Sequence, residues 1–502
     1  MTNIVLTTIN ARYVHAALGL RYLAANMGSL QSQTTIVEFV LGQRAFEMVE
    51  DLLAFEPKII GMGVYIWNVE ECTRVVAILK RIAPEVLVVL GGPEVSYETA
   101  DQRICQLADY VITGWGDVSF PLLATELMAG LKPADKIIRG LQPPLDTIRL
   151  PYELYTDEDI RQRFLYVEAS RGCPFKCEFC LSALDKTAWP FELENFMQSL
   201  EGIYRRGGRN FRFVDRTFNL KIGVSQRILE FFLERMDNNL FLHFELIPDH
   251  LPDTLKQTIL RFPPGALHFE IGIQTWNPTV QTLISRRQDD LKAEENIRWL
   301  REQSHALIHV DLIAGLPGED WDSFGRGFDR LLALGPHEIQ VGILKRLRGA
   351  PIDRHSQTHQ LRFNPDPPYN VLATDCMSFF QMQRITRFAR FWDLVGNSGR
   401  FRQTLPLLLA NSAFQEFCNF SDWIYAKTHK THEFAFERLC EFLHDYLVGP
   451  RRLTPETVRQ AVVTDYEASG ARGRLAFMAS GVRPRDAQSA TARAKMRQTR
   501  HV

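Results

Sequence analysis

The sequence Arg171-Gly-Cys-Pro-Phe-Lys-Cys-Glu-Phe-Cys180 carries three cysteines in the spacing C-x3-C-x2-C, directly after the strand-like run 164–169. Three thiolates on so short a loop can converge on one iron–sulfur cluster, each binding a different iron. A cubane cluster has one further iron, which is left without a cysteine and stays open to a ligand, as in catalytic metal sites. The spacing therefore predicts an oxygen-sensitive [4Fe–4S] cluster on Cys173, Cys177 and Cys180.

Two other interpretations of the loop are a structural zinc site and a ferredoxin-like electron-transfer site. Structural zinc usually takes four protein ligands in two separated pairs, and no second C-x2-C or H-x3-H pair lies nearby. A ferredoxin needs a fourth cysteine at matched spacing, whereas Cys376, Cys418 and Cys440 are remote and not grouped. The pattern favours the cluster with one open iron.

Residues 164 to 351 alternate β-rich runs with helical stretches. The strand candidates are Phe164–Ala169, Asn210–Val214, Leu242–Leu246, Ala266–Ile273, Ile308–Ile313 and Glu338–Ile343. Such regular alternation predicts a barrel or partial barrel, with an active site at the carboxyl ends of the strands.

The region from residue 1 to about 135 shows a similar alternation, which predicts parallel βαβ units. Its strand candidates are Ile4–Thr8, Thr34–Val40, Ile59–Tyr65, Val86–Leu90 and Tyr110–Thr113. Glycines stand at the carboxyl-terminal ends of the third, fourth and fifth strands, at positions 61, 63, 91, 92, 114 and 116. Ligands of open α/β sheets bind at these strand ends, where glycine allows a close approach. The alternative, that the glycines only form tight turns, stays open.

Composition divides the chain into five parts. We expect an α/β domain at 1–135, a proline-rich linker at 136–163, a barrel at 164–360 and a helical domain at 361–470. The last part, 471–502, has eight Lys or Arg against one acid and is expected to be a disordered tail. A solvated tail is favoured there over a nucleic-acid contact.

The composition as a whole is that of an ordinary globular protein. The chain has 502 residues, is 45% hydrophobic and carries a net charge of -1, so it offers no overall electrostatic case for nucleic acid or an anionic membrane. No run reaches the roughly 18 apolar residues of a membrane helix, and residues 1–6 resemble a strand and not a signal peptide. Scattered cysteines do not form a disulfide framework. We therefore expect a reducing, cytoplasmic location.

The cysteine loop after the first barrel strand resembles that of the radical S-adenosylmethionine (radical SAM) superfamily. Motifs similar to the family's second, fourth, fifth and sixth strands follow in order: Phe213-Val-Asp-Arg-Thr-Phe-Asn219, Glu270-Ile-Gly-Ile-Gln-Thr275, Asp311-Leu-Ile-Ala-Gly-Leu-Pro-Gly-Glu319 and Gln340-Val-Gly-Ile-Leu-Lys-Arg-Leu-Arg-Gly-Ala-Pro351. Each motif alone is typical of a core strand with a turn, but their joint order supports the resemblance. It implies a partial (β/α)6 TIM-type barrel.

The resemblance also implies a SAM site. The usual Gly-Gly-Glu is absent from the second-strand region, and Asp215 is expected to hold the methionine amino group instead. The implied SAM-binding residues are Phe179, Asp215, Glu270, Gln274, Gly315 and Lys345. In this family an electron from the reduced cluster cleaves SAM, and the resulting radical takes hydrogen from the substrate.

An α/β domain before such a barrel, across a proline-rich linker, resembles the cobalamin-binding radical SAM enzymes. The likeness rests on Met62–Asn68, Val89–Glu94 and Thr113–Phe120, which follow the third, fourth and fifth strands. It implies a Rossmann-like cobalamin-binding domain with contacts from His15, Tyr65, Trp67, Asn68, Gly91, Gly92, Gly114 and Gly116. A flavodoxin-like domain with another ligand, or with none, is the alternative.

His15 departs from the pattern of proteins that bind cobalt through a histidine. Those proteins often carry Asp-x-His-x-x-Gly, whereas His15 has no Asp two residues before it and Gly19 is one residue too far. We expect His15 to lie near the corrin as a turn or helix-start residue. An unligated lower face of the corrin would favour methyl transfer from cobalt.

These features predict a cobalamin-dependent radical SAM methyltransferase that acts on an unactivated carbon, or on phosphorus, of a small molecule. Its expected electron donor is a flavodoxin or ferredoxin. A cyclase or rearrangement enzyme, like those that build tetrapyrrole rings, uses the same cofactors and stays open. An iron–sulfur sensor is a third interpretation, against which the run of barrel motifs argues. The helical region resembles an appended domain of unknown function from one branch of the superfamily, which either covers the barrel mouth or only extends the packing.

Overall fold

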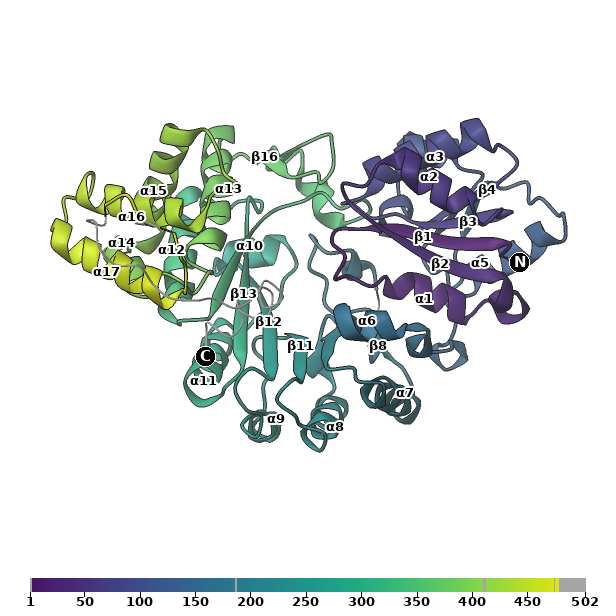
Figure 1. The fold of residues 1–502 in the computed structure, drawn as a ribbon, viewed down its shortest axis with the longest axis horizontal. Coiled ribbons are helices and arrows are strands. Elements are labelled where there is room, and N and C mark those ends of the chain that lie inside the picture. The colour runs from purple at the N-terminus through teal and green to yellow at the C-terminus, as the bar shows by residue number, and fades with distance from the viewer. Residues whose placement is uncertain (1, 186, 410–411, 474, 478–502) are drawn as a thin grey trace. The chain divides into compact units, whose positions relative to one another are not determined.

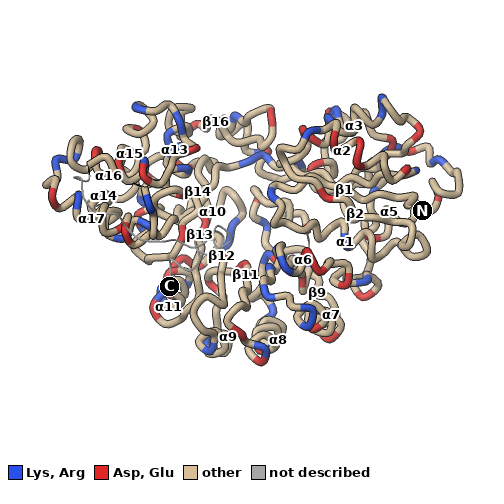
Figure 2. Tube along the Cα trace, viewed as in Figure 1, with Lys and Arg blue, Asp and Glu red and all other residues tan. Residues whose placement is uncertain are grey.

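The computed structural model describes residues 2–185, 187–409, 412–473 and 475–477. Most of the predicted basic tail lies outside these described residues. The chain forms two compact units: Met1–Phe244 with Lys345–Asp353 and Asn364–Asn370, and Glu245–Leu344 with Arg354–Phe363 and Val371–Val502. Acidic and basic residues are interspersed along both (Figure 2). None of the helices in the described ranges is long and apolar enough to span a bilayer.

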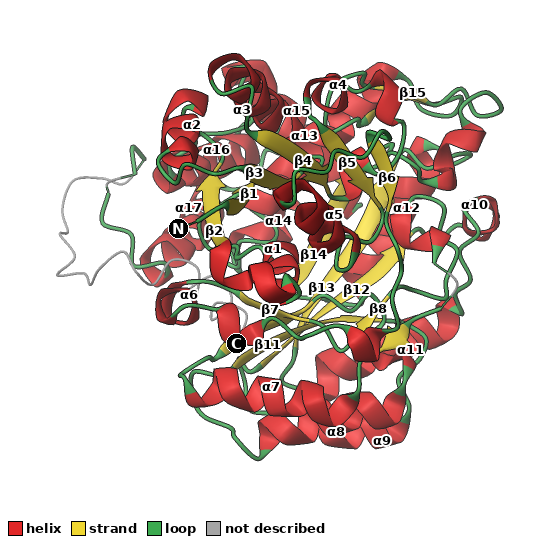
Figure 3. Ribbon diagram, turned by 90° about the vertical axis from the view of Figure 1, so that its right-hand side faces the viewer, coloured by secondary structure: helices red, strands yellow, loops and turns green. Residues whose placement is uncertain are grey.

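The first unit begins with a six-stranded sheet in the order β2-β1-β3-β4-β5-β6. Its strands, seen side by side in Figure 3, are β1 (Ile4–Asn10), β2 (Thr34–Val40), β3 (Ile59–Gly63), β4 (Leu87–Gly91), β5 (Tyr110–Thr113) and β6 (Ile137–Arg139). All pairings are parallel, and Ile4 of β1 lies opposite both Thr34 and Ile59. The chain order therefore reverses at β1, and ligands bind open α/β sheets beside such a point.

Helices cover both faces of this sheet because successive side chains of a strand point to opposite faces. Ile4 and Leu6 of β1 pack with α1 (Leu18–Ala25) and α5 (Ser119–Met128). Val5 and Ile9 pack on the other face, which is covered by α2 (Ala45–Leu53), α3 (Val69–Ile82) and α4 (Arg103–Leu107) (Figure 1). A strand buried on both sides is a continuous apolar run, which confirms the predicted α/β class.

The segment expected as a linker, residues 136–163, contains regular structure. Strand β6 pairs with β5 at the edge of the sheet, and the helix α6 (Asp157–Gln162) follows. A capping box starts α6, because Thr156 Oγ1 accepts from the Asp159 amide at 3.1 Å while Asp159 Oδ2 accepts from the Thr156 amide at 2.9 Å. Strand β6 escaped prediction because its three residues are not buried and show no apolar alternation.

A second six-stranded sheet has the order β14-β13-β12-β11-β10-β7. The strands are β7 (Leu165–Val167), β10 (Asn210–Phe213), β11 (Phe241–Leu246), β12 (Leu267–Gln274), β13 (Leu307–Ala314) and β14 (Glu338–Ile343). Strand β11 begins in the first unit and ends in the second. The helices between these strands are α7 (Leu193–Arg205), α8 (Ile222–Leu233), α9 (Asp253–Ile259), α10 (Pro278–Leu283), α11 (Asp290–Gln303) and α12 (Trp321–Ala333). The predicted strands of this series are all present, each ending within two residues of its predicted limits.

The helical C-terminal region is also confirmed. After the short strands β15 (Arg362–Phe363) and β16 (Val371–Ala373), it contains α13 (Phe379–Leu394), α14 (Thr404–Leu408), α15 (Ala413–Thr428), α16 (Phe436–Val448) and α17 (Pro455–Ala468). Phe388 and Trp392 of α13 meet Phe328 of α12 edge to face, with ring centroids 4.9 and 4.8 Å apart. Aromatic packing thus attaches this region to the last described helix of the β/α series.

Candidate functional site

The cysteine loop lies inside a short antiparallel hairpin, β8 (Ser170–Arg171) with β9 (Trp189–Pro190), in which Arg171 pairs with Trp189. Gly172 has a φ of 91°, and a Cβ there would lie 2.5 Å from the carbonyl oxygen of Thr187, so only glycine fits. The Cys180 amide donates to the Cys177 carbonyl at 3.0 Å and closes a turn. Cys173 is buried, and the other two cysteines are half-buried.

The chemistry of this donor set fits an iron–sulfur cluster. Burial, together with the nearby Cys180 and Cys177 thiols, raises the pKa of Cys173 to about 11. Such a thiol stays protonated until a metal stabilises its thiolate, and cluster iron would supply that charge. Among the described residues, no group of three or more His, Cys, Asp or Glu side chains is placed to hold a single metal ion. In a cubane cluster each cysteine binds a different iron.

Asp215, expected at the SAM amino group, has both carboxylate oxygens engaged by the strand end before the cysteine loop. Its Oδ2 accepts from the Ala169 amide at 2.9 Å, and its Oδ1 accepts from Ser170 Oγ at 2.6 Å. Burial raises the pKa of Asp215 to about 7, although these two hydrogen bonds lower it. The cavity beside it measures only about 20 Å³, room for roughly one water molecule. Asp215 thus positions the loop in this structure, and its contact with SAM stays a prediction.

A cavity of about 490 Å³ lies at the carboxyl ends of β3, β4 and β5, within the usual size range of small-molecule pockets. Five of the predicted cobalamin-binding residues line it: Tyr65, Gly91, Gly92, Gly114 and Gly116. A Cβ on Gly114 would meet nothing within 4 Å, and one on Gly91 would meet only a carbonyl oxygen at 4.0 Å. These glycines leave open a space that larger residues would fill, which fits a bulky cofactor.

Other residues of this cavity were not predicted as site residues. They are Asp117 of the β5 loop and, near the cysteines, Glu168, Arg171, Leu181, Ser182 and Asp185. Asp117 and Arg171 lie in motifs that follow strands, and this position was the only feature of the sequence that could have identified them as site residues. The sequence patterns of the strands do not show that the two motifs line the same cavity, because this depends on tertiary structure.

The three remaining predicted cobalamin residues do not line the cavity. Asn68 is fully buried, accepts from the Tyr65 amide at 2.8 Å and donates to the Ile9 carbonyl at 3.0 Å, so its amide ties the β3 loop to β1. Trp67 stacks on Tyr65 with ring centroids 4.4 Å apart. His15 Nδ1 lies 2.6 Å from the hydroxyl of Tyr166 on β7. Burial lowers the pKa of His15, so it favours the neutral imidazole.

In the second unit, Gln274 ends β12 with a φ of 70°, and its Oε1 is buried and accepts no hydrogen bond from a described residue. An orphaned acceptor at a strand end fits a ligand that donates to it. Glu270 lies four residues earlier on β12, before the shift in strand register between Gly272 and Gln274. Burial raises the pKa of Asp311, and the nearby Glu270 carboxylate adds to this effect. His309 Nε2 is 3.2 Å from Asp311 Oδ1. Glu270 therefore belongs to a charged group deeper along the strands than Gln274.

Gly315, after β13, is covered by the C-terminal region. A Cβ there would lie 2.4 Å from Val371 Cγ1 and 3.0 Å from Met382 Cε. Val371 of β16 and Met382 of α13 thus pack directly on this strand end. In the first unit, Phe179 is half-buried beside Cys180, whereas Lys345 is exposed and its backbone bridges Asn370.

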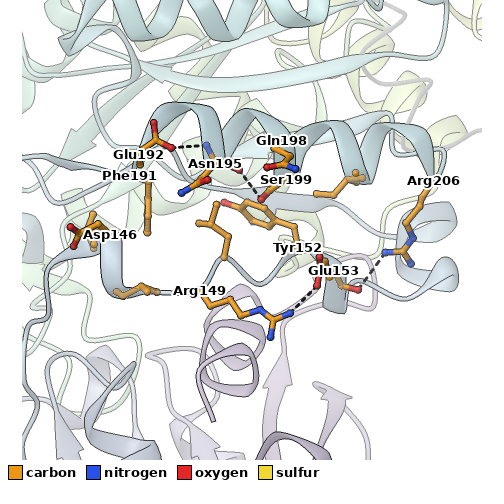
Figure 4. Close-up of a pocket in the computed structure, with 15 residues that line it drawn as sticks. Asp146, Arg149, Tyr152, Glu153, Phe191, Glu192, Asn195, Gln198, Ser199 and Arg206 are labelled. Carbon is orange, nitrogen blue, oxygen red and sulfur yellow. Dashed lines mark hydrogen bonds and ion pairs between the residues drawn. The ribbon is translucent and has the colours of Figure 1, made fainter. Parts of the chain in front are cut away.

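A larger cavity of about 720 Å³ lies elsewhere in the first unit, between residues 145–153 and α7 (Figure 4). Arg149 pairs with Glu153 at 3.0 Å on one wall, and Arg206 stands at the end of α7 on the other. No predicted site residue lines it.

Three family models match the chain, each to one of its parts. The B12 binding domain matches residues 4–124, the radical SAM superfamily matches 167–331, and a protein family of unknown function, DUF4080, matches 357–500.

Curated relatives include methyltransferases. The chain is 26% identical over 465 residues to the "Cobalamin-dependent radical SAM methyltransferase TokK" of Streptomyces tokunonensis, covering 83% of this chain and 64% of the relative. It is 25% identical to the "2-(S-pantetheinyl)-carbapenam-3-carboxylate methyltransferase" of Streptantibioticus cattleyicolor, covering 59% and 48%. The chain thus spans about half to two thirds of the length of these relatives.

Among solved structures, the radical SAM methyltransferase TsrM of Kitasatospora setae, with cobalamin and a [4Fe-4S] cluster bound, superposes with a TM-score of 0.59. The match covers 94% of this chain and 100% of that structure at 15% sequence identity, so it shows the fold.

Proposed function

We propose that this chain, which belongs to the radical SAM superfamily and carries a B12-binding domain, is a cobalamin-dependent radical SAM methyltransferase. The cavity of the first unit carries the proposal. One side of it consists of the glycine-rich ends of β3, β4 and β5, and the other includes Glu168 and Arg171 beside the cluster loop. A corrinoid held there would stand next to the iron–sulfur cluster, as a two-cofactor reaction requires.

The relatives support methyl transfer as the reaction. The two curated relatives and the superposed structure are all named as methyltransferases, and two of the three, TokK and TsrM, combine cobalamin with radical SAM chemistry. Because the chain spans only part of these relatives, its own substrate is a proposal. We infer a small molecule methylated at an unactivated carbon, and a flavodoxin or ferredoxin as electron donor.

The chain's own residues would divide the work. When bound, the cluster and SAM supply a radical and the corrinoid supplies a methyl group. Cys173, Cys177 and Cys180 would hold the cluster, and the burial of Cys173 would keep water from it. Gln274 Oε1 would accept a hydrogen bond from SAM. Gly91 and Gly114 would admit the corrinoid, because neither carries a side chain into the cavity.

The decisive experiment uses the full chain, reconstituted anaerobically with iron, sulfide and hydroxocobalamin, and SAM with a deuterated methyl group. We expect both 5′-deoxyadenosine and S-adenosylhomocysteine, and one metabolite of a cell extract that gains a single labelled methyl group. The Cys173→Ala protein is the matched control and should form no 5′-deoxyadenosine. A product that loses hydrogen without gaining the label would replace methyl transfer by the cyclase interpretation. No 5′-deoxyadenosine under reducing conditions would reject radical SAM chemistry.

A further inference from the structure

Arg171 joins the 490 Å³ cavity at the ends of β3, β4 and β5 to the cysteine loop. Its Nη1 lies 2.9 Å from Asp117 Oδ2, on the loop after β5 of the B12-binding domain. Its Nε lies 2.6 Å from Glu168 Oε1, just after β7 of the second sheet. The three side chains are 15%, 9% and 11% exposed, and all three residues line the cavity. One guanidinium therefore bridges two domains with a separate nitrogen for each carboxylate, a geometry that lysine does not offer.

Aromatic rings fix the plane of this guanidinium. Its central carbon lies 4.3 Å from the ring centroid of Tyr22 and 5.1 Å from that of Trp115, both of the B12-binding domain. It lies 5.5 Å from the ring of Phe191, which follows β9. Such contacts are most favourable when the cation is desolvated, as here. Arg171 is thus held in one orientation by residues from both sides of the domain junction.

The backbone transmits this orientation to the cluster ligands. Arg171 pairs with Trp189 in the hairpin, and Gly172 leads directly to Cys173. The backbone at Gly172 runs close to the other side of the hairpin, because a Cβ there would lie 2.5 Å from the Thr187 carbonyl oxygen and 2.8 Å from the Trp189 ring. A displacement of the Arg171 side chain by a change at Asp117 would therefore move Cys173.

We propose that Arg171 is a positioning residue that couples the binding of a corrinoid to the conformation of the cysteine loop. This inference rests on the proposed function. A ligand that fills the cavity holds Asp117 and Arg171 in place and so holds Cys173 in place for the cluster. By reciprocity, an assembled cluster tightens corrinoid binding by the same factor. We expect a factor of about ten, within the usual range of such couplings.

The test measures the coupling and not activity. The dissociation constant of hydroxocobalamin is determined by visible absorption, anaerobically and without SAM, on full-length protein with and without the reconstituted cluster. The wild type should bind about tenfold more tightly with the cluster. Arg171→Lys keeps the charge but cannot reach both carboxylates, and Asp117→Asn keeps Arg171 paired with Glu168. In each variant the ratio of the two constants should fall towards one.

Arg163 provides the matched control. It lies in the same unit and pairs with Glu38 at 2.8 Å and with Asp159 at 3.5 Å, but none of the three lines the cavity. Arg163→Lys should leave the tenfold ratio unchanged.

A second readout is the paramagnetic spectrum of the reduced cluster. With dithionite keeping both cofactors reduced, cob(II)alamin should shift the g values of the cluster signal in the wild type and not in Arg171→Lys. If Arg171 only supports the fold, Arg171→Lys should raise both dissociation constants by the same factor and leave their ratio at ten. That result would overturn the coupling by Arg171 but not the proposed function. A wild type that binds no cobalamin or no cluster overturns the proposed function as well.

Discussion

Arg348 Nε lies 2.9 Å from Glu94 Oε1, although the two residues are 254 positions apart in the chain. The hydroxyl of Tyr369 donates to the same carboxylate oxygen at 2.8 Å. Glu94 stands in a short 3-10 helix after β4, and its neighbours Pro93, Ser96 and Tyr97 line the 490 Å³ cavity at the ends of β3, β4 and β5. The segments on either side of residue 360 therefore support this loop within the first unit, so the cavity depends on residues from the end of the barrel region.

Arg348→Met should destabilise the protein because it leaves the Glu94 carboxylate, only 3% exposed, without its ion-pair partner. We expect a loss of about 3 kcal/mol in the free energy of unfolding, and weaker cobalamin binding. The double variant Glu94→Gln/Arg348→Met should recover most of this loss, since no buried charge remains. Urea unfolding of the two variants and the wild type gives the comparison. Equal losses in the single and double variants would contradict the role of the ion pair.

Gly92→Ala and Gly114→Ala should have different effects, although both glycines line the cavity at positive φ. A Cβ on Gly92 would lie 2.4 Å from the Val64 carbonyl oxygen, whereas one on Gly114 meets nothing. Gly114→Ala should cost about 1 kcal/mol from backbone strain and reduce cobalamin affinity by intruding on the cavity. Gly92→Ala should cost about 3 kcal/mol or more, because backbone atoms must move. Thermal unfolding and a hydroxocobalamin titration separate the two effects, and equal stability losses would refute the distinction.

Much of the fold could be predicted from local patterns. The six strands from Leu165 to Ile343 showed apolar runs at regular intervals, and the three cysteines stood after the first of them. What escaped prediction depends on distant contacts. The hydrogen bonds from Ala169 and Ser170 to the Asp215 carboxylate join residues more than 40 positions apart, and no local pattern indicates them. Strand β6 has three residues and none of them is fully buried, so its sequence shows no burial pattern.

The contacts of Arg171 illustrate the same limit. Its position before Gly172 and Cys173 identified it as part of a ligand loop. Its partner Asp117 is 54 residues away in another domain, and the aromatic rings around it come from three separate segments. Such a cluster arises only when two domains meet, so no spacing in the sequence could indicate it.

Cys173→Ala, Cys177→Ala and Cys180→Ala should each abolish reductive cleavage of SAM, since each removes one of the three predicted iron ligands. Iron content should fall in each variant. Cobalamin binding should persist, weakened by no more than the coupling factor of about ten. Cys418→Ala, at a buried cysteine of the C-terminal region, is the control and should cleave SAM normally. Cleavage that survives in any loop variant would refute the cluster assignment.

His15→Gln should leave the paramagnetic spectrum of bound cob(II)alamin unchanged. His15 Nδ1 is engaged by the Tyr166 hydroxyl at 2.6 Å, and the residue does not line the cavity. We therefore expect no splitting from a histidine nitrogen in the wild type. A nitrogen splitting that disappears in His15→Gln would show that His15 binds cobalt.

Asp215→Asn should change how stability depends on pH. Burial raises the pKa of Asp215 to about 7. The hydrogen bonds from Ser170 and Ala169 lower this pKa, and the nearby Glu168 carboxylate has a smaller raising effect. The unfolded chain has the ordinary low aspartate pKa, so between about pH 4 and 7 the folded state binds more protons than the unfolded state. This group therefore stabilises the fold most at low pH, and its contribution falls as the pH rises to about 7. Between pH 5 and 8 the wild type should lose about 2 kcal/mol more than Asp215→Asn.

Asn at this position keeps the interactions that matter for the comparison. Its amide oxygen can accept from the Ala169 amide, and its amide nitrogen can donate to Ser170 Oγ, so the strand end before the cysteine loop stays tied down. Groups elsewhere titrate equally in both proteins and cancel in the difference between them. Urea unfolding midpoints at pH 5, 6, 7 and 8 measure that difference. Parallel curves for the two proteins would mean that Asp215 is already ionised in the folded state at pH 5, with its carboxylate stabilised by the Ala169 and Ser170 hydrogen bonds more strongly than burial opposes it.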